Sequence, residues 1–229
     1  MKKFTALFFC IISALCLSAC NQDVQTVDAI TEELEQHFSV GILLPDVGLG
    51  DQSFNDLAIK GLVKARDDMK VLWSYRDLNT SSSLEEGLEE LLVENHDVII
   101  GVGYSVQELL EKEAADNPDQ RFVLVDTVSD VANIDSITFK EDEGSYLAGV
   151  VAALNSTSNV IGFVGGMEDP VIQKFLDGYR EGAQSIKPEI EVLVTYANTY
   201  SDDKVGAQLA SDMIAQNADV LYAAAGYTG

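Results

Sequence analysis

Basic side chains are scarce in this chain. Its 229 residues include 14 Lys and Arg against 38 Asp and Glu, which gives a formal net charge of −24. A surface that binds nucleic acid needs a basic footprint to neutralise phosphates, so this balance argues against a nucleic-acid partner. The acidic residues fall mostly within predicted helices, and we interpret them as a well-solvated surface. An acidic docking face for a partner is the alternative.

Histidine is nearly absent, which limits the available chemistry. His37 and His96 are the two histidines, and neither has a partner at metal-ligand spacing. Two such residues build no Ser/His/Asp arrangement, and the chain has no Gly-x-Ser-x-Gly elbow. The pair Gly101-Val-Gly103 lacks the third glycine of the dinucleotide-binding fingerprint. The sequence therefore predicts no metal, no cofactor and no enzyme activity.

All three cysteines lie within the first 20 residues. Two lysines precede an apolar run over residues 4–17, a pattern typical of a secretory signal peptide and too short to span a bilayer stably. The run ends in Leu-Ser-Ala-Cys at residues 17–20, which resembles the bacterial lipobox. We therefore predict a lipoprotein signal peptide over residues 1–19 and a diacylated Cys20, which anchors the chain to the cell membrane on its extracytoplasmic face. The mature chain would then hold no thiol for a disulfide or for catalysis. An ordinary cleaved signal with a chance cysteine is the alternative.

The rest of the chain contains one supersecondary unit twice, over residues 39–104 and 159–227. Each copy has an apolar strand, a Gly/Asp loop, a helix, a strand spelled Val-Leu-x-x-Tyr, a second helix and an Asp-Val strand that ends in glycine. Such βαβαβ units form doubly wound lobes, whose ligands bind outside the carboxyl ends of the parallel strands. The predicted fold class is therefore α/β, with two doubly wound parallel-sheet lobes that face each other across a cleft.

The predicted boundaries follow from these units. Residues 20–38 form the lipidated cysteine and a polar tether, residues 39–158 the first lobe with its crossover, and residues 159–229 the second lobe. The chain stops just after a predicted strand and inside an apparent loop. We therefore expect the second lobe to be C-terminally incomplete.

Two helices carry clear local signals. Ser53, with Asp56 three residues later, predicts a capping box at the start of a helix that begins at Phe54. Residues 143–154 are apolar on every side, which predicts a buried helix at the junction of the lobes.

Five motifs together resemble the basic membrane protein family, the substrate-binding lipoproteins that serve ABC transporters for nucleosides. They are Asp-Gln-Ser-Phe-Asn at 51–55, Ile-Ile-Gly-Val-Gly at 99–103, the long segment 136–154, Gly-Phe-Val-Gly-Gly-Met at 162–167 and Ala-Ala-Gly at 224–226. The long segment is the specific one, because the glycine pieces alone are weak signals. The resemblance implies a periplasmic-binding-protein type I fold with a ligand held between two lobes.

The resemblance also implies a set of ligand-binding residues: Asp46, Gln52, Phe54, Asn55, Asp126, Tyr222 and Gly226. Asp46 and Asp126 would face the ribose, and Phe54 and Tyr222 would sandwich the base, whose edge Gln52 would reach. The chain departs from the family at Tyr222, where the family has Phe, and in the loop before Phe54, which is one residue shorter than usual.

Residue chemistry supports these assignments independently and also leaves alternatives. A ribose diol offers two adjacent donors that a carboxylate accepts together, and Asp46 and Asp126 both end apolar strands, where an ionised side chain needs a partner. Each of these carboxylates is alternatively a cap for the next turn or helix. Phe54 and Tyr222 are alternatively core residues, and the polar side chains near Phe54 are alternatively ordinary helix-start residues.

The sequence thus predicts a monomeric, membrane-anchored solute-binding protein that captures a nucleoside, preferably a purine, for the permease of an ABC importer. A ligand sensor on the same scaffold is one alternative. A sugar-type binding protein and an extracellular enzyme acting on nucleosides are the others, and the enzyme would need an acid/base group or nucleophile in the cleft.

Overall fold

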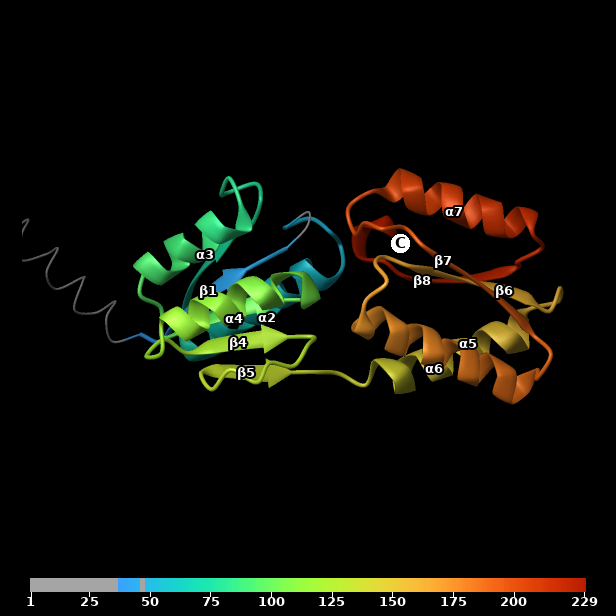
Figure 1. Cartoon of the computed structure of the whole chain (residues 1–229), viewed down its shortest axis with the longest axis horizontal. Helices are drawn as coiled ribbons and strands as arrows, with labels where there is room; N and C mark the ends of the chain where they lie inside the picture. Colours follow the sequence, from blue (N-terminus) through green and yellow to red (C-terminus); the bar gives the residue numbers. More distant parts are fainter. Residues whose placement is uncertain (1–36, 46–47) are drawn as a thin grey trace, which may run out of the picture.

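The computed structural model describes residues 37–45 and 48–229, which form two α/β lobes (Figure 1). The predicted signal peptide, Cys20 and Asp46 lie outside the described residues. Within the described part, no helix has the length and apolar character needed to cross a membrane.

Lobe one is a five-stranded parallel sheet with the strand order β2-β1-β3-β4-β5. Its strands are β1 (Ser39–Leu43), β2 (Leu72–Arg76), β3 (Val98–Val102), β4 (Phe122–Val125) and β5 (Ile134–Ile137). Its helices are α2 (Phe54–Met69), α3 (Leu84–Val93), the 3-10 turn η1 (Tyr104–Val106) and α4 (Gln107–Asp116).

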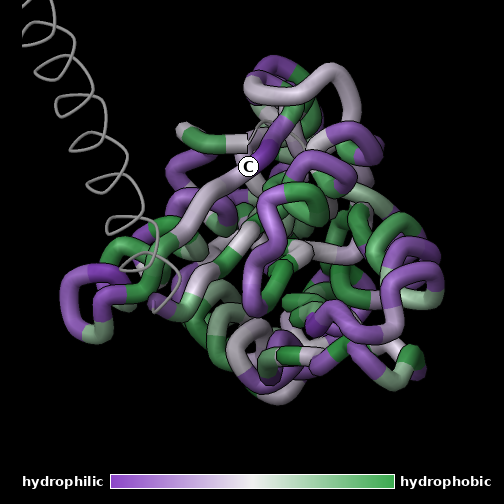
Figure 2. Tube along the Cα trace, turned by 90° about the vertical axis from the view of Figure 1, so that its left-hand side faces the viewer, coloured by the Kyte–Doolittle hydropathy of each residue, from purple (hydrophilic) through white to green (hydrophobic). Residues whose placement is uncertain are grey.

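The central strands of lobe one are apolar on both faces because helices cover both faces. In β1, Val40 and Ile42 pack in the cluster that includes Leu62 of α2, whereas Leu43 packs in the cluster that includes Leu88 of α3. Successive side chains of a strand point to opposite faces, so a strand between two helical layers needs an unbroken apolar run. Figure 2 shows hydrophilic stretches on helical turns and loops at the periphery of the molecule.

Lobe two is a three-stranded parallel sheet in the order β7-β6-β8. Its strands are β6 (Val160–Gly165), β7 (Glu191–Tyr196) and β8 (Val220–Ala224). Helices α5 (Glu141–Asn155) and α6 (Pro170–Ile186) cover one face, and α7 (Asp203–Ala215) covers the other; the 3-10 turn η2 (Gly226–Thr228) follows β8 (Figure 1). The predicted α/β fold with two doubly wound parallel lobes is confirmed.

The internal repeat extends to single hydrogen bonds. In lobe one, the carboxylate of Asp97, just before β3, accepts from the Ser39 N–H at 2.7 Å. In lobe two, the carboxylate of Asp219, just before β8, accepts from the N–H groups of Thr157 and Ser158 at 2.6 and 2.8 Å. A hydrogen bond from the Ser156 side chain, together with these backbone bonds, holds the pKa of Asp219 below its ordinary value. In each lobe, an aspartate therefore ties the start of the third strand to the start of the first.

Helix α5 packs with lobe two, and one of its faces is open. Its backbone runs so close to α6 that a Cβ added at Gly149 would lie 2.0 Å from the Tyr179 carbonyl oxygen. On the other side, Leu147 and Leu154 are each 65% exposed. The expectation of a helix buried on every side was therefore wrong, because no described segment covers this face.

Candidate functional site

A cleft of about 920 Å³ lies between the two lobes. Its lobe-one wall comes from the loop before α2, the start of α2 and the carboxyl ends of the strands, as parallel sheets favour. These residues are Pro45, Asp51, Ser53, Phe54, Asn55, Gly103, Tyr104, Ser105 and Asp126. The opposite wall comes from the crossover, the first turns of α5 and α6 and the end of β8, and includes Glu141, Ser145, Asp169, Phe175, Tyr200, Tyr222 and Gly226.

The carboxylate of Asp51 fixes the start of α2 at this wall. It accepts from the backbone N–H groups of Ser53 at 2.9 Å, Asn55 at 2.8 Å and Asp56 at 3.1 Å. Ser53 is the N-cap residue, but its side chain makes no capping hydrogen bond. The predicted capping box is therefore wrong: Asp51, two residues earlier, satisfies the unpaired N–H groups that a helix start leaves.

Asn55 presents a bare acceptor at the cleft. Its amide nitrogen donates to the carbonyl oxygens of Pro45 at 3.1 Å and Gly48 at 3.0 Å. Two carbonyl acceptors require the amide nitrogen on that side, so the orientation of the amide is settled. The Oδ1 atom is buried and has no hydrogen-bond partner. A molecule in the cleft that donates a hydrogen bond would satisfy this oxygen.

Asp126 follows β4 in a left-handed backbone conformation, with φ at 80°. Burial is the main cause that raises the pKa of its carboxyl to about 6, and the negative charges of Glu141 and Asp169 raise it further, while Lys174 opposes them. A half-buried carboxyl with perturbed ionisation in a cleft is typical of a functional position. Asp126 lines the cleft, and its contact with a ligand stays a prediction.

Phe54 and Tyr222 line the cleft from opposite lobes, and both also pack against a core. The Tyr222 ring is 5.8 Å from that of Phe163 and 5.0 Å from that of Tyr179, and its hydroxyl lies 3.2 Å from Ser145 Oγ. Tyr222 is therefore both a residue packed against the core of lobe two and a residue that lines the cleft. Gly226 also lines the cleft, with φ at 56°.

The structure does not bring Gln52 to the cleft with the other predicted residues. Its side chain is exposed, it is absent from the lining, and its backbone adopts φ of 52°. Its role at the base edge finds no support in this geometry. The left-handed conformation at a non-glycine residue is part of the tight turn that Asp51 and Asp56 hold together.

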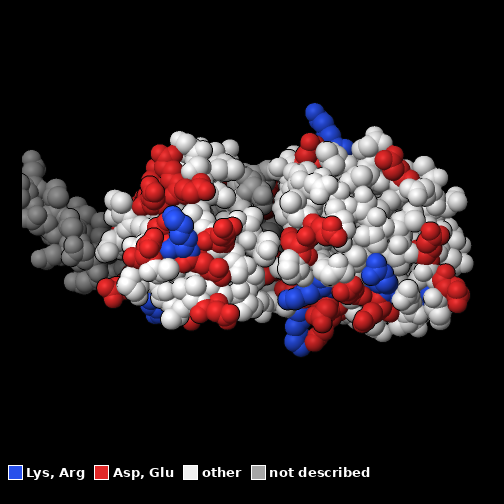
Figure 3. All heavy atoms as spheres, viewed as in Figure 1, with Lys and Arg blue, Asp and Glu red and all other residues white. Residues whose placement is uncertain are grey.

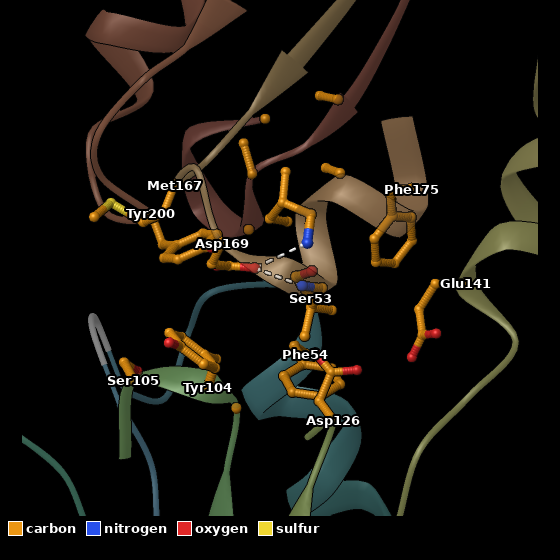
Figure 4. A pocket seen from close by; sticks show the side chains of 18 of the residues that line it. Ser53, Phe54, Tyr104, Ser105, Asp126, Glu141, Met167, Asp169, Phe175 and Tyr200 are labelled. Atoms are coloured by element: carbon orange, nitrogen blue, oxygen red, sulfur yellow. Dashed lines mark hydrogen bonds between the residues drawn. The ribbon is translucent and has the colours of Figure 1, made fainter. Parts of the chain in front are cut away.

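Sequence reasoning missed several lining residues of lobe two. Figure 4 shows Tyr200, Asp169 and Phe175 across the cleft from Phe54 and Asp126. The Asp169 carboxylate caps α6, accepting from the N–H groups of the first turn, and also accepts from the Tyr200 hydroxyl at 2.7 Å. An aspartate before a proline predicts the helix start. That this start faces the other lobe depends on tertiary structure, which no local pattern carries.

Among the described residues, no group of three or more His, Cys, Asp or Glu side chains is arranged to hold a metal ion. The cleft instead combines hydrogen-bond acceptors that have no partner, carboxyl groups and aromatic rings. Such a set suits a small organic molecule with hydrogen-bond donors and a flat apolar face.

Two doubly wound lobes with a cleft between their strand ends define a two-lobed ligand-binding architecture. The chain belongs to the Bmp family, described as "ABC transporter substrate-binding protein PnrA-like", whose model matches residues 38–229. This family consists of substrate-binding components of ABC transporters.

Named relatives agree with this assignment. The chain is 35% identical to the "CD4+ T-cell-stimulating antigen" of Listeria innocua, in a match that covers 100% of this chain and 67% of the relative. It is 36% identical to the "ABC transporter nucleoside-binding protein BmpA" of Lactococcus lactis (80% and 53% covered) and 30% identical to "Basic membrane protein A" of Borreliella burgdorferi (83% and 59%). The chain thus spans between half and two thirds of the length of these relatives.

Solved structures show the same fold. A solute-binding protein of an ABC transporter system from Aeropyrum pernix K1 matches with a TM-score of 0.75 and 31% identity, over 83% of this chain and 56% of the other. A transcriptional activator of the comK gene from Bacillus halodurans matches with a TM-score of 0.65 and 24% identity, over 83% of this chain and 64% of the other, and shows the fold alone.

Proposed function

We propose that this protein captures a nucleoside in the interlobe cleft and delivers it to the permease of an ABC importer. The observation that carries the proposal is the buried Oδ1 of Asn55, which has no hydrogen-bond partner and lies beside Phe54 in the cleft wall that also contains Asp126. An aromatic ring stacks on a base, a carboxylate accepts from a ribose diol, and a bare amide oxygen accepts from a donor on the base edge. Membership of the family and the name of the Lactococcus lactis relative support the same ligand class.

The proposal includes a preference for purines. Purine rings offer more stacking area than pyrimidine rings, and stacking contributes roughly 1–3 kcal/mol per base. Phe54 is one platform. Tyr222, Phe175 and Tyr200 line the facing side and are candidates for the second.

The proposal also places the protein on the extracytoplasmic face of the membrane, anchored through a lipidated Cys20 and acting as a monomer. The lipobox-like ending of the signal segment supports the anchor. An acidic surface, visible on both lobes in Figure 3, suits a protein exposed to the medium.

Isothermal titration calorimetry tests the proposal. We expect guanosine, adenosine and inosine to bind, uridine and cytidine to bind more weakly, and free ribose to bind feebly because it lacks the ring. Tight binding of sugars with no response to the three purine nucleosides would overturn it.

A further inference from the structure

A buried carboxylate oxygen without a hydrogen-bond partner also lies at the cleft. Glu141 begins α5, at the point where the chain has crossed from β5 to lobe two, and it is 5% exposed. Its Oε1 accepts from the Phe139 N–H at 3.2 Å, whereas its Oε2 is buried with no hydrogen-bond partner. The Lys174 ammonium forms an ion pair with Oε2 at 3.6 Å, a distance just beyond that of a hydrogen bond. A buried carboxylate oxygen costs free energy unless a donor reaches it.

The helix dipole does not account for this burial. A negative charge in the first turn of a helix is favourable, but Asp142 and Glu143 supply such charges in the same turn of α5 while remaining exposed. Glu141 therefore has a different reason to be buried at the cleft wall.

The surroundings of Glu141 indicate what reaches it. Its carboxylate points into the cleft on the side where Asp126 and Phe54 lie (Figure 4). After burial, the nearby negative charge of Glu141 is the next cause that raises the pKa of Asp126, although the two residues belong to different lobes. Asp169, from the start of α6, adds negative charge, and Lys174 partly offsets it. Two carboxyls held near each other are an acceptor pair for two donors.

We infer that Glu141 is a ligand-binding residue which, together with Asp126, accepts hydrogen bonds from two neighbouring hydroxyl groups of the bound molecule. This inference rests on the proposed function and adds a lobe-two partner to the ribose contact predicted for Asp126. Because the two carboxyls come from different lobes, a vicinal diol between them replaces their repulsion with hydrogen bonds and joins the two walls of the cleft. The ligand class is a neutral riboside with both ring hydroxyls free.

Calorimetry with two ligands separates a direct contact from a structural role. The ligands are guanosine and 2′,3′-dideoxyguanosine, and the proteins are the parent, Glu141→Gln and the control Glu143→Gln. Glu143 lies in the same helical turn with its side chain 64% exposed and pairs with Lys140. We expect Glu141→Gln to weaken guanosine binding about tenfold or more and to leave dideoxyguanosine binding unchanged. The control should change neither affinity.

The outcomes are distinguishable. A parent that binds no nucleoside overturns the proposed function itself. A parent that binds guanosine while Glu141→Gln either keeps full affinity or loses the same factor for both ligands overturns the inference alone. If Glu141→Gln does not fold, as circular dichroism would show, Glu141→Asp takes its place: the shorter carboxylate should lower the preference for guanosine over dideoxyguanosine, and an unchanged preference contradicts the inference.

Discussion

At the scale of single residues, two buried polar atoms at the cleft lack hydrogen-bond partners. In the described part of the chain, the buried side-chain atoms without a hydrogen-bond partner are Asn55 Oδ1, Glu141 Oε2 and the Tyr179 hydroxyl. Asn55 and Glu141 line the cleft. Natural proteins leave few such groups, and their concentration at one surface indicates that the cleft is built for a molecule that donates hydrogen bonds.

Asp126 should show a conflict between stability and binding. Its pKa is raised from 3.8 to about 6 in the folded protein, so its contribution to stability is complete below about pH 4 and is lost as the pH rises through about 6. Asp126→Asn removes the charge and should raise the stability at about pH 7, by at most about 3 kcal/mol and by less where solvent screens the group. Thermal melting between about pH 4 and pH 8 checks this. A variant less stable than the parent at every pH would contradict it.

The same substitution should weaken ligand binding. If the Asp126 carboxylate accepts from the ribose diol, Asp126→Asn should cost about 1.5–3 kcal/mol of binding free energy, or about tenfold or more in affinity. Calorimetry with guanosine and 2′-deoxyguanosine measures the effect, and the parent should prefer the ribonucleoside. Equal affinity of the parent for both would remove Asp126 from the ribose contact.

At the scale of elements, α5 and α6 are held together by glycines. A Cβ at Gly182 would lie 1.9 Å from the Tyr146 carbonyl oxygen, and one at Gly178 would lie 2.2 Å from the Asp142 carbonyl oxygen. Backbone cannot yield as a flexible side chain does, so a methyl group at either position forces the helices apart. This pair carries Glu141 and Asp169 at its cleft end, so its spacing sets the lobe-two wall.

Gly182→Ala should therefore destabilise the protein by about 1–3 kcal/mol, the range of overpacking changes. The matched control is Gly61→Ala on the exposed side of α2, where a Cβ has no atom within 4 Å. The control should stabilise by about 0.5–1 kcal/mol, because alanine favours the helix. Chemical denaturation compares the two variants. A neutral Gly182→Ala would show that the helices are not in this contact.

The sequence predicts an element well where local patterns determine it and poorly where contacts with distant segments do. The strand beginning at Ser39 and the helix beginning at Phe54 follow from local patterns and were predicted at these residues. The open face of α5 was not, because apolar composition indicates burial without saying which segment provides it. Glu141 was missed for a related reason: within a run of charged residues, its burial arises only when the crossover folds over the first turn of α5.

At the scale of the whole molecule, duplication explains both the cleft and its position. Each lobe repeats the strand, helix and aspartate-tie pattern, so each presents its strand ends on one edge, and the two edges form the walls. The lobe architecture could be predicted from the sequence. Asp126, singled out because it ends an apolar strand, lines the cleft, and its ribose contact stays a prediction. Phe175 and Tyr200 could not, because only the tertiary fold brings these two residues to the cleft beside Tyr222, which the family resemblance had indicated.

The proposed anchor is also a property of the whole molecule. Cys20→Ala should move the protein from the membrane fraction to the soluble fraction, because the diacyl group is the proposed attachment. Cell fractionation followed by immunoblotting measures it, with Cys16→Ala, inside the predicted signal peptide, as the control that stays with the membrane. A Cys20→Ala variant that remains in the membrane fraction would rule out the lipid anchor.

A crystal structure of the protein grown with guanosine tests the central claim most directly. The account predicts density for one nucleoside between the lobes, with the base against Phe54 and the ribose hydroxyls within hydrogen-bond distance of the Asp126 carboxylate. An empty cleft at saturating guanosine, or a nucleoside bound outside it, would contradict the account.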